Sequence, residues 1–151
     1  MENNLTATAD TAAGLVAARV DLAAGPERVF RALTTAEICD WWVRPGVFDT
    51  REWQGDVRVG GRWQSAGIGM AGPYRMAGDF IEIAAPHRLV HGWAVIGAPG
   101  GTSTVRYDLA AIPGGTRLTL RHEGLRVPEI CVNTAKGWET SLARLAELLR
   151  G

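Results

Sequence analysis

The segment that follows residue 127 constrains the fold more than any other part of the sequence. Apolar side chains recur in it at intervals of four, three, four, three and four residues: Cys131, Ala135, Trp138, Leu142, Leu145 and Leu149. This spacing places them along one face of an α-helix. Such a helix is roughly 30 Å long, so its apolar face predicts an apolar surface of similar length elsewhere in the molecule.

The middle of the sequence is β-rich and is the candidate for that surface. Apolar and polar residues alternate there in short segments that glycine and proline separate, which is typical of strands. The predicted strands lie near residues 47–54, 58–65, 74–83, 88–95, 103–111 and 115–123. Pro113-Gly114-Gly115 predicts a tight turn that joins the last two strands as a hairpin.

The N-terminal part adds one strand and two short helices. Residues 1–13 are small and polar and are predicted to form a disordered tail, while residues 14–151 form one domain. Alternation over 15–22 predicts the strand. Pro26 suits the first position of a helix, and a second short helix ends before Pro45. The predicted order is therefore strand, two short helices, six strands and a long helix.

Composition excludes several classes of protein. Sixteen basic residues balance sixteen acidic ones, so no net field favours nucleic acid or an anionic membrane as a partner. The sequence has no apolar run of 18 residues and no signal-peptide pattern at its start. Cys39 and Cys131 are too few and too far apart to predict a disulfide framework. We therefore expect a cytoplasmic protein with reduced thiols.

A series of short motifs follows the predicted order along the chain. They are residues 24–34, Trp41-Trp42 followed by proline, and residues 56–63, 78–83, 86–93, 114–122 and 136–138. Together they resemble the activator-of-heat-shock-protein-90-ATPase homologue family of the SRPBCC group, within the birch-pollen-allergen and START-like superfamily. This resemblance implies an α+β helix-grip fold. In that fold a curved antiparallel sheet of six to seven strands wraps around the long C-terminal helix and leaves a cavity between them.

Strand parity selects candidate residues for that cavity. Alternate residues of a strand share one face, and the apolar positions of 88–95, 103–111 and 115–123 mark the inner face of each predicted strand. Two histidines and a tyrosine fall on this face and are expected to lie opposite the C-terminal helix. A mostly apolar pocket with a few polar anchors is typical of a small-molecule site. The predicted ligand-binding residues are His91, Trp93, Tyr107, His122, Trp138, Trp42 and Trp63.

Other chemistry receives less support from the sequence. His87, His91 and His122 show no metal-ligand spacing with the two cysteines, so we expect no metal and no cofactor. Residues 67–72 match the dinucleotide pattern G-x-G-x-x-G, but Pro73 and a predicted strand follow in place of a helix. We interpret this stretch as a hairpin loop.

Three functions remain open at this level. The first is binding of a small hydrophobic or amphipathic molecule, as a carrier or by sequestration. The second is a module that contacts a chaperone, which the family resemblance implies. The third is a cavity enzyme, a cyclase or hydrolase, that uses His91, Tyr107 or His122 in acid–base chemistry. A monomer and a homodimer are both compatible with the sequence.

Overall fold

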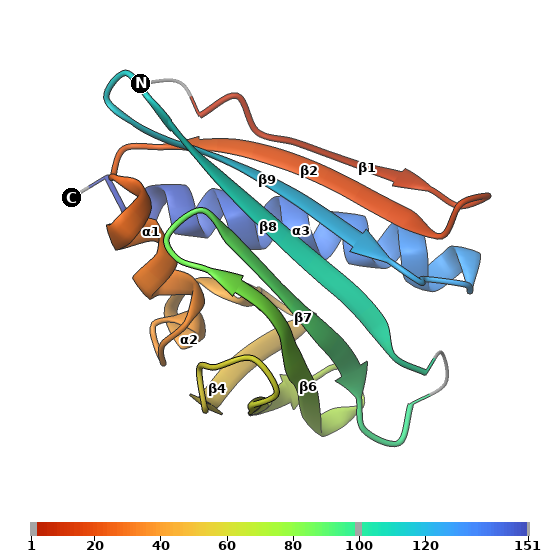
Figure 1. Ribbon diagram of the computed structural model, residues 1–151. Helices are drawn as coiled ribbons and strands as arrows, with labels where there is room; N and C mark the ends of the chain where they lie inside the picture. The colour runs from red at the N-terminus through yellow and green to blue at the C-terminus, as the bar shows by residue number, and fades with distance from the viewer. Residues whose placement is uncertain (1–2, 99–100, 151) are drawn as a thin grey trace.

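The computed structural model describes residues 3–98 and 101–150 of the chain. Its elements in chain order are β1 Thr6–Asp10, β2 Leu15–Leu22, α1 Pro26–Leu33, α2 Ile38–Trp41, β3 Val43–Arg44, β4 Phe48–Gly55, β5 Arg62–Gly69, β6 Gly72–Ala84, β7 Arg88–Val95, β8 Ser103–Ile112, β9 Gly115–Glu123 and α3 Pro128–Leu148. Within this part of the chain, nine strands form one sheet of order β1-β2-β9-β8-β7-β6-β5-β4-β3 (Figure 1). Every pair of neighbouring strands is antiparallel.

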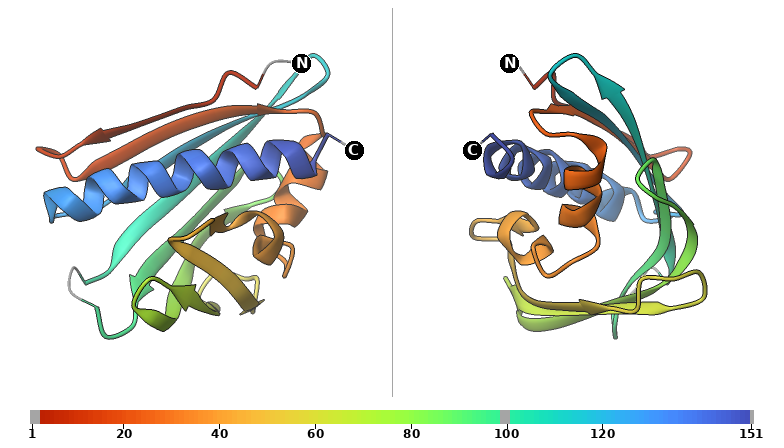
Figure 2. Two further views of the ribbon diagram at one scale, coloured as in Figure 1. Left: turned by 180° about the vertical axis from the view of Figure 1, so that it is seen from behind. Right: turned by 60° about the vertical axis from the view of Figure 1, so that its left-hand side comes forward.

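The sheet curls around α3, which lies along its concave side (Figure 2). The apolar stripe predicted for this helix is buried at every position, because it meets the inner faces of the strands. Leu142 and Leu145 are completely inaccessible to solvent. The predicted α+β helix-grip fold is therefore confirmed.

The two short helices close one end of the curled sheet and lead the chain into the cavity wall. Arg28 of α1 makes two hydrogen bonds to the carboxylate of Glu37, at 2.9 and 2.7 Å. The indole N–H of Trp41 donates to the carbonyl oxygen of Ala32 at 3.0 Å. These contacts fix α2 against α1 and so determine where Trp42, the next residue, enters the core.

The sheet is larger than predicted, and the predicted tail is partly wrong. Thr6–Asp10 forms β1, which pairs antiparallel with β2; residues 1–2 of that tail lie outside the described residues. The only apolar residues of β1 are the small side chains of Ala7 and Ala9, which alternate with polar ones and give a weak strand signal. The strand is held by its backbone hydrogen bonds to β2 and by the contacts of Leu5 and Ala7 with the core. The two-residue β3, at the opposite edge of the sheet, was not predicted either.

One predicted strand is displaced along the chain. The strand expected over 58–65 is β5, which begins at Arg62. Residues before it form a turn in which the N–H of Gly61 donates to the carbonyl of Arg58 at 2.8 Å, and Gly60 has a positive φ of 86°. A positive φ suits glycine and interrupts an extended strand. The glycine-rich segment 67–72 contains the turn of the β5–β6 hairpin, but the turn is shorter than the predicted loop: only Met70 and Ala71 lie between the strands, and Gly67, Gly69 and Gly72 pair within them.

Candidate functional site

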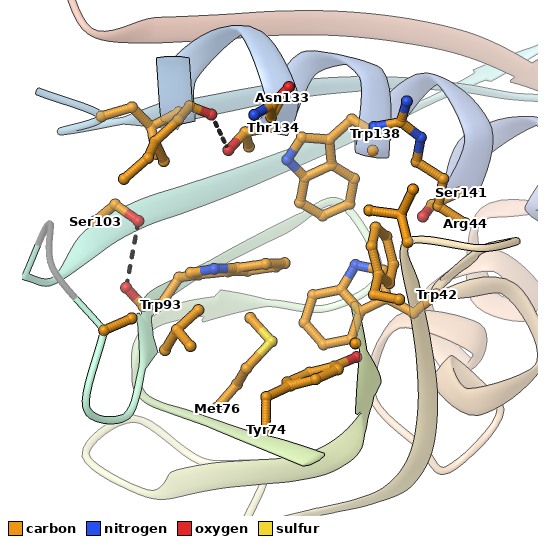
Figure 3. Close-up of a pocket in the computed structure, with 18 of the residues that line it drawn as sticks. Trp42, Arg44, Tyr74, Met76, Trp93, Ser103, Asn133, Thr134, Trp138 and Ser141 are labelled. Carbon is orange, nitrogen blue, oxygen red and sulfur yellow. Dashed lines mark hydrogen bonds between the residues drawn. The ribbon is translucent and has the colours of Figure 1, made fainter. Parts of the chain in front are cut away.

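A cavity of about 590 Å³ lies between the curled sheet and α3, a volume in the usual range for small-molecule sites. Residues from β3 to β8, from the β9–α3 connection and from α3 line it (Figure 3). Met70 of the β5–β6 turn, Ala98 and Gly101 of the β7–β8 connection, and Val127 before α3 lie at the same end of the sheet. This end therefore forms the cavity mouth.

Three tryptophans form one wall of the cavity. The ring centroids of Trp42 and Trp93 are 4.4 Å apart with the rings almost perpendicular. Trp138 on α3 lies 5.4 Å from Trp93 and 6.2 Å from Trp42. Such edge-to-face and tilted packing suits aromatic rings. The result is a rigid aromatic surface on which an apolar ligand can lie.

A chain of hydrogen bonds supports this wall from behind. The indole N–H of Trp138 donates to Nδ1 of His122 at 3.0 Å. Because an indole nitrogen can only donate, Nδ1 is an acceptor and the neutral imidazole carries its proton on Nε2. That proton faces Oγ of Ser103 at 2.7 Å. The Ser103 hydroxyl in turn donates to the carbonyl of Trp93 at 3.3 Å.

This direction of hydrogen bonding limits what the Ser103–His122 pair can do. A serine nucleophile must donate its proton to an unprotonated imidazole nitrogen. Here Nε2 of His122 holds the proton, and Ser103 accepts from it. Burial, together with the charge that His91 would carry, lowers the pKa of His122 to about 3. The pair is therefore arranged to hold Trp93 and Trp138 in place rather than to abstract a proton.

His91 and Tyr107 lie deeper, away from the large cavity. Nδ1 of His91 donates to the carbonyl of Gly92 at 2.8 Å, and the indole of Trp63 donates to the same oxygen at 3.1 Å. Burial lowers the pKa of His91 to about 4, although its hydrogen bond acts in the opposite direction. Burial also raises the pKa of the Tyr107 phenol. The two rings, with Trp63 and Phe80, surround a void of about 10 Å³, which has room for at most one water molecule.

Comparison with known proteins identifies the family. Residues 23–150 match the model of the family described as Activator of Hsp90 ATPase homolog 1-like protein. The chain belongs to this family. A protein from Chromobacterium violaceum is similar in structure, with a TM-score of 0.82 and 26% identity over 91% of this chain and 98% of that one. An AHSA1 protein from Silicibacter pomeroyi has a TM-score of 0.74 and 25% identity over 89% and 96% of the two chains. No curated protein is significantly similar in sequence.

In this AHSA1-type chain the structure separates the predicted site residues into two groups. Trp42, Trp93 and Trp138 line the large cavity. The other four are buried around it, and within the described residues none of them lines it: His91, Tyr107, His122 and Trp63. Strand parity predicted the inward direction of His91, Tyr107 and His122 correctly. It could not separate cavity from packed core, because neighbouring side chains fill the space in front of His91 and Tyr107.

Several cavity residues were missed by the sequence reasoning. Tyr74 and Met76 lie on β6 at alternate positions, so the same parity argument could have found them. Ser141 lies one helical turn after Trp138 on α3 and shares its face. Arg44 gave no signal, because β3 was not predicted. Burial raises the pKa of the Tyr74 phenol, which lies 3.5 Å from Oγ1 of Thr50.

Two further observations concern metals and membranes. Among residues 3–98 and 101–150, histidine, cysteine and acidic side chains are nowhere grouped in threes in a way that could hold a metal ion. In the same ranges, no helix is both long enough and apolar enough to cross a membrane.

Proposed function

We propose that this protein binds a small hydrophobic or amphipathic molecule in the cavity between the sheet and α3, as a carrier or by sequestration. The cavity of about 590 Å³ with its wall of Trp42, Trp93 and Trp138 carries this proposal. A mostly apolar site with few polar groups gains affinity by removing apolar ligand surface from water. The thiols of Cys39 and Cys131 are free, which supports action in the reducing cytosol.

A matched pair of substitutions on α3 tests this function. Thr134 lines the cavity, whereas Thr140 lies on the exposed side of the same helix. Each hydroxyl donates to the carbonyl four residues earlier, to Ile130 and Lys136 respectively. Thr134→Trp fills the cavity and is expected to abolish binding of the neutral fluorescent probe N-phenyl-1-naphthylamine. Thr140→Trp is expected to leave the probe's affinity unchanged, and equal affinity in both variants contradicts the proposal.

A chaperone-associated role is the second candidate, because the matching family is described by its likeness to an activator of the Hsp90 ATPase. The test is to add the purified protein to Hsp90 and measure ATP hydrolysis. Stimulation that persists in Thr134→Trp assigns the activity to a surface other than the cavity. Absence of stimulation at saturating protein removes this candidate.

A further inference from the structure

The charges along the cavity are unbalanced. Arg44 and Arg126 line it, and the described lining includes no aspartate or glutamate. Within the part of the chain that the structure describes, neither arginine forms an ion pair. On the convex side of the sheet, by contrast, Arg88 pairs with Asp108 at 2.8 Å. The cavity therefore has a positive potential that the protein itself does not neutralise.

A buried hydroxyl at the cavity also lacks a partner. Ser141 is 1% exposed, and its Oγ makes no hydrogen bond to any described residue. Serine and threonine within helices commonly donate to the carbonyl four residues earlier, and Thr134 and Thr140 of the same helix do so at 2.6 and 3.1 Å. Ser141 does not. A buried polar group without a partner is unfavourable, and a ligand oxygen would supply the missing acceptor.

The arginine and the serine lie in the same part of the wall. Arg44 follows Trp42 by two residues, and Ser141 follows Trp138 by one helical turn. Because the rings of these two tryptophans are 6.2 Å apart and β3 packs against α3, the structure brings Arg44 and Ser141 to one end of the aromatic surface (Figure 3). Arg44 is half-buried, whereas Arg126 is exposed near the mouth. Arg44 is therefore the better placed of the two cations to bind a group on a ligand.

We propose that the ligand is an anionic amphiphile whose carboxylate, sulfate or phosphate group binds Arg44 and accepts a hydrogen bond from Ser141. Its apolar part lies against the three tryptophans. This inference rests on the proposed function and specifies its ligand class. A cationic ligand, which an aromatic wall could otherwise attract, is disfavoured by the two arginines. Arg126 adds to the positive potential at the mouth and draws the anion toward the cavity.

The test compares three ligands that share a ten-carbon chain: decanoate, decanol and decylammonium. Each ligand competes with N-phenyl-1-naphthylamine for the purified protein, at ligand concentrations below those at which the ligand forms micelles. Decanoate is expected to displace the probe at a concentration about 10-fold lower than decanol does, because a charge-assisted hydrogen bond adds that much affinity. Decylammonium is expected to be the weakest competitor. Arg44→Gln is expected to remove this preference, Arg44→Lys to keep part of it, and Ser141→Ala to reduce it about 3-fold.

Arg19→Gln is the matched control, because Arg19 is an exposed arginine of β2 that does not line the cavity. It should leave the preference unchanged. Equal displacement by decanoate and decanol overturns the anionic class but leaves the proposed function intact. If Arg44→Gln and Arg19→Gln lose the preference for decanoate equally, the anionic class is also overturned, because the preference would then follow the net charge of the protein. If the probe itself does not bind, the proposed function fails, and the inference fails with it.

Discussion

The hydrogen bond from Trp138 to His122 should contribute measurably to stability, and a double-mutant cycle can isolate that contribution. Trp138 is 2% exposed and His122 is 0% exposed, with 3.0 Å between the two nitrogens. Trp138→Phe keeps an aromatic ring but leaves Nδ1 of His122 buried without a donor. An unsatisfied buried acceptor costs about 1–3 kcal/mol. The smaller ring also leaves a cavity, so the total loss should be about 2–4 kcal/mol.

The cycle separates the hydrogen bond from the loss of packing. His122→Leu is combined with Trp138→Phe, and the free energy of unfolding of all four proteins is measured by urea titration at pH 7. We expect a coupling free energy of about 1–2 kcal/mol between the two sites. The control is Trp41→Phe with His122→Leu. Trp41 is equally buried, but its indole donates to the carbonyl of Ala32 instead, so these two changes should be additive.

Two results would refute this reasoning. A coupling free energy below about 0.3 kcal/mol, within the usual error of additivity, would mean that the Trp138–His122 bond is energetically unimportant. Nitrogen NMR gives an independent check, because the structure requires the His122 proton on Nε2. Observation of the Nδ1–H tautomer would contradict the hydrogen-bond chain and the conclusion that Ser103 accepts from this histidine.

Three further predictions concern stability. Leu142→Ala should cost about 2–5 kcal/mol in urea titration, since Leu142 is 0% exposed; a loss below 1 kcal/mol would contradict its place in the core. His91 and His122 have native pKa values of about 4 and 3, below the unfolded value, so each stabilises the fold above about pH 6.5 and loses that effect as the pH falls. At pH 5 the loss should be roughly 2 kcal/mol per histidine, and a free energy of unfolding that is flat from pH 7 to 5 would refute it. Arg117→Met should destabilise by about 1–3 kcal/mol, because Asp21 is 4% exposed and loses its ion pair; the partial exposure of Arg117 keeps the effect below that of a fully buried pair. The control is Arg106→Met, which breaks an exposed ion pair with Asp108 on the same sheet. Thermal unfolding should show a larger loss of stability for Arg117→Met than for this control.

The arrangement of the sheet and its long helix could be predicted because the relevant signals are local. The stripe from Cys131 to Leu149 repeats with the period of a helix, and the central strands repeat with a period of two. Each period specifies which side chains point inward, whatever the rest of the chain does. For this reason the inward direction of His91, Tyr107 and His122 followed from the sequence. The family motifs then indicated that this order of elements is that of the helix-grip fold.

Only the tertiary structure decided which inward residues meet a cavity and which meet packed neighbours. His91 and Tyr107 are enclosed by Trp63 and Phe80. Phe80 lies opposite His91 on the neighbouring strand β6, whereas Trp63 comes from β5, which does not pair with β7. The direction of the His122 hydrogen bonds depends on Trp138, which α3 brings across the sheet. The same is true of Arg44 and Ser141, whose proximity arises because β3 packs on α3. Strand and helix periods determine faces, whereas side-chain volumes contributed by remote segments determine where space is left.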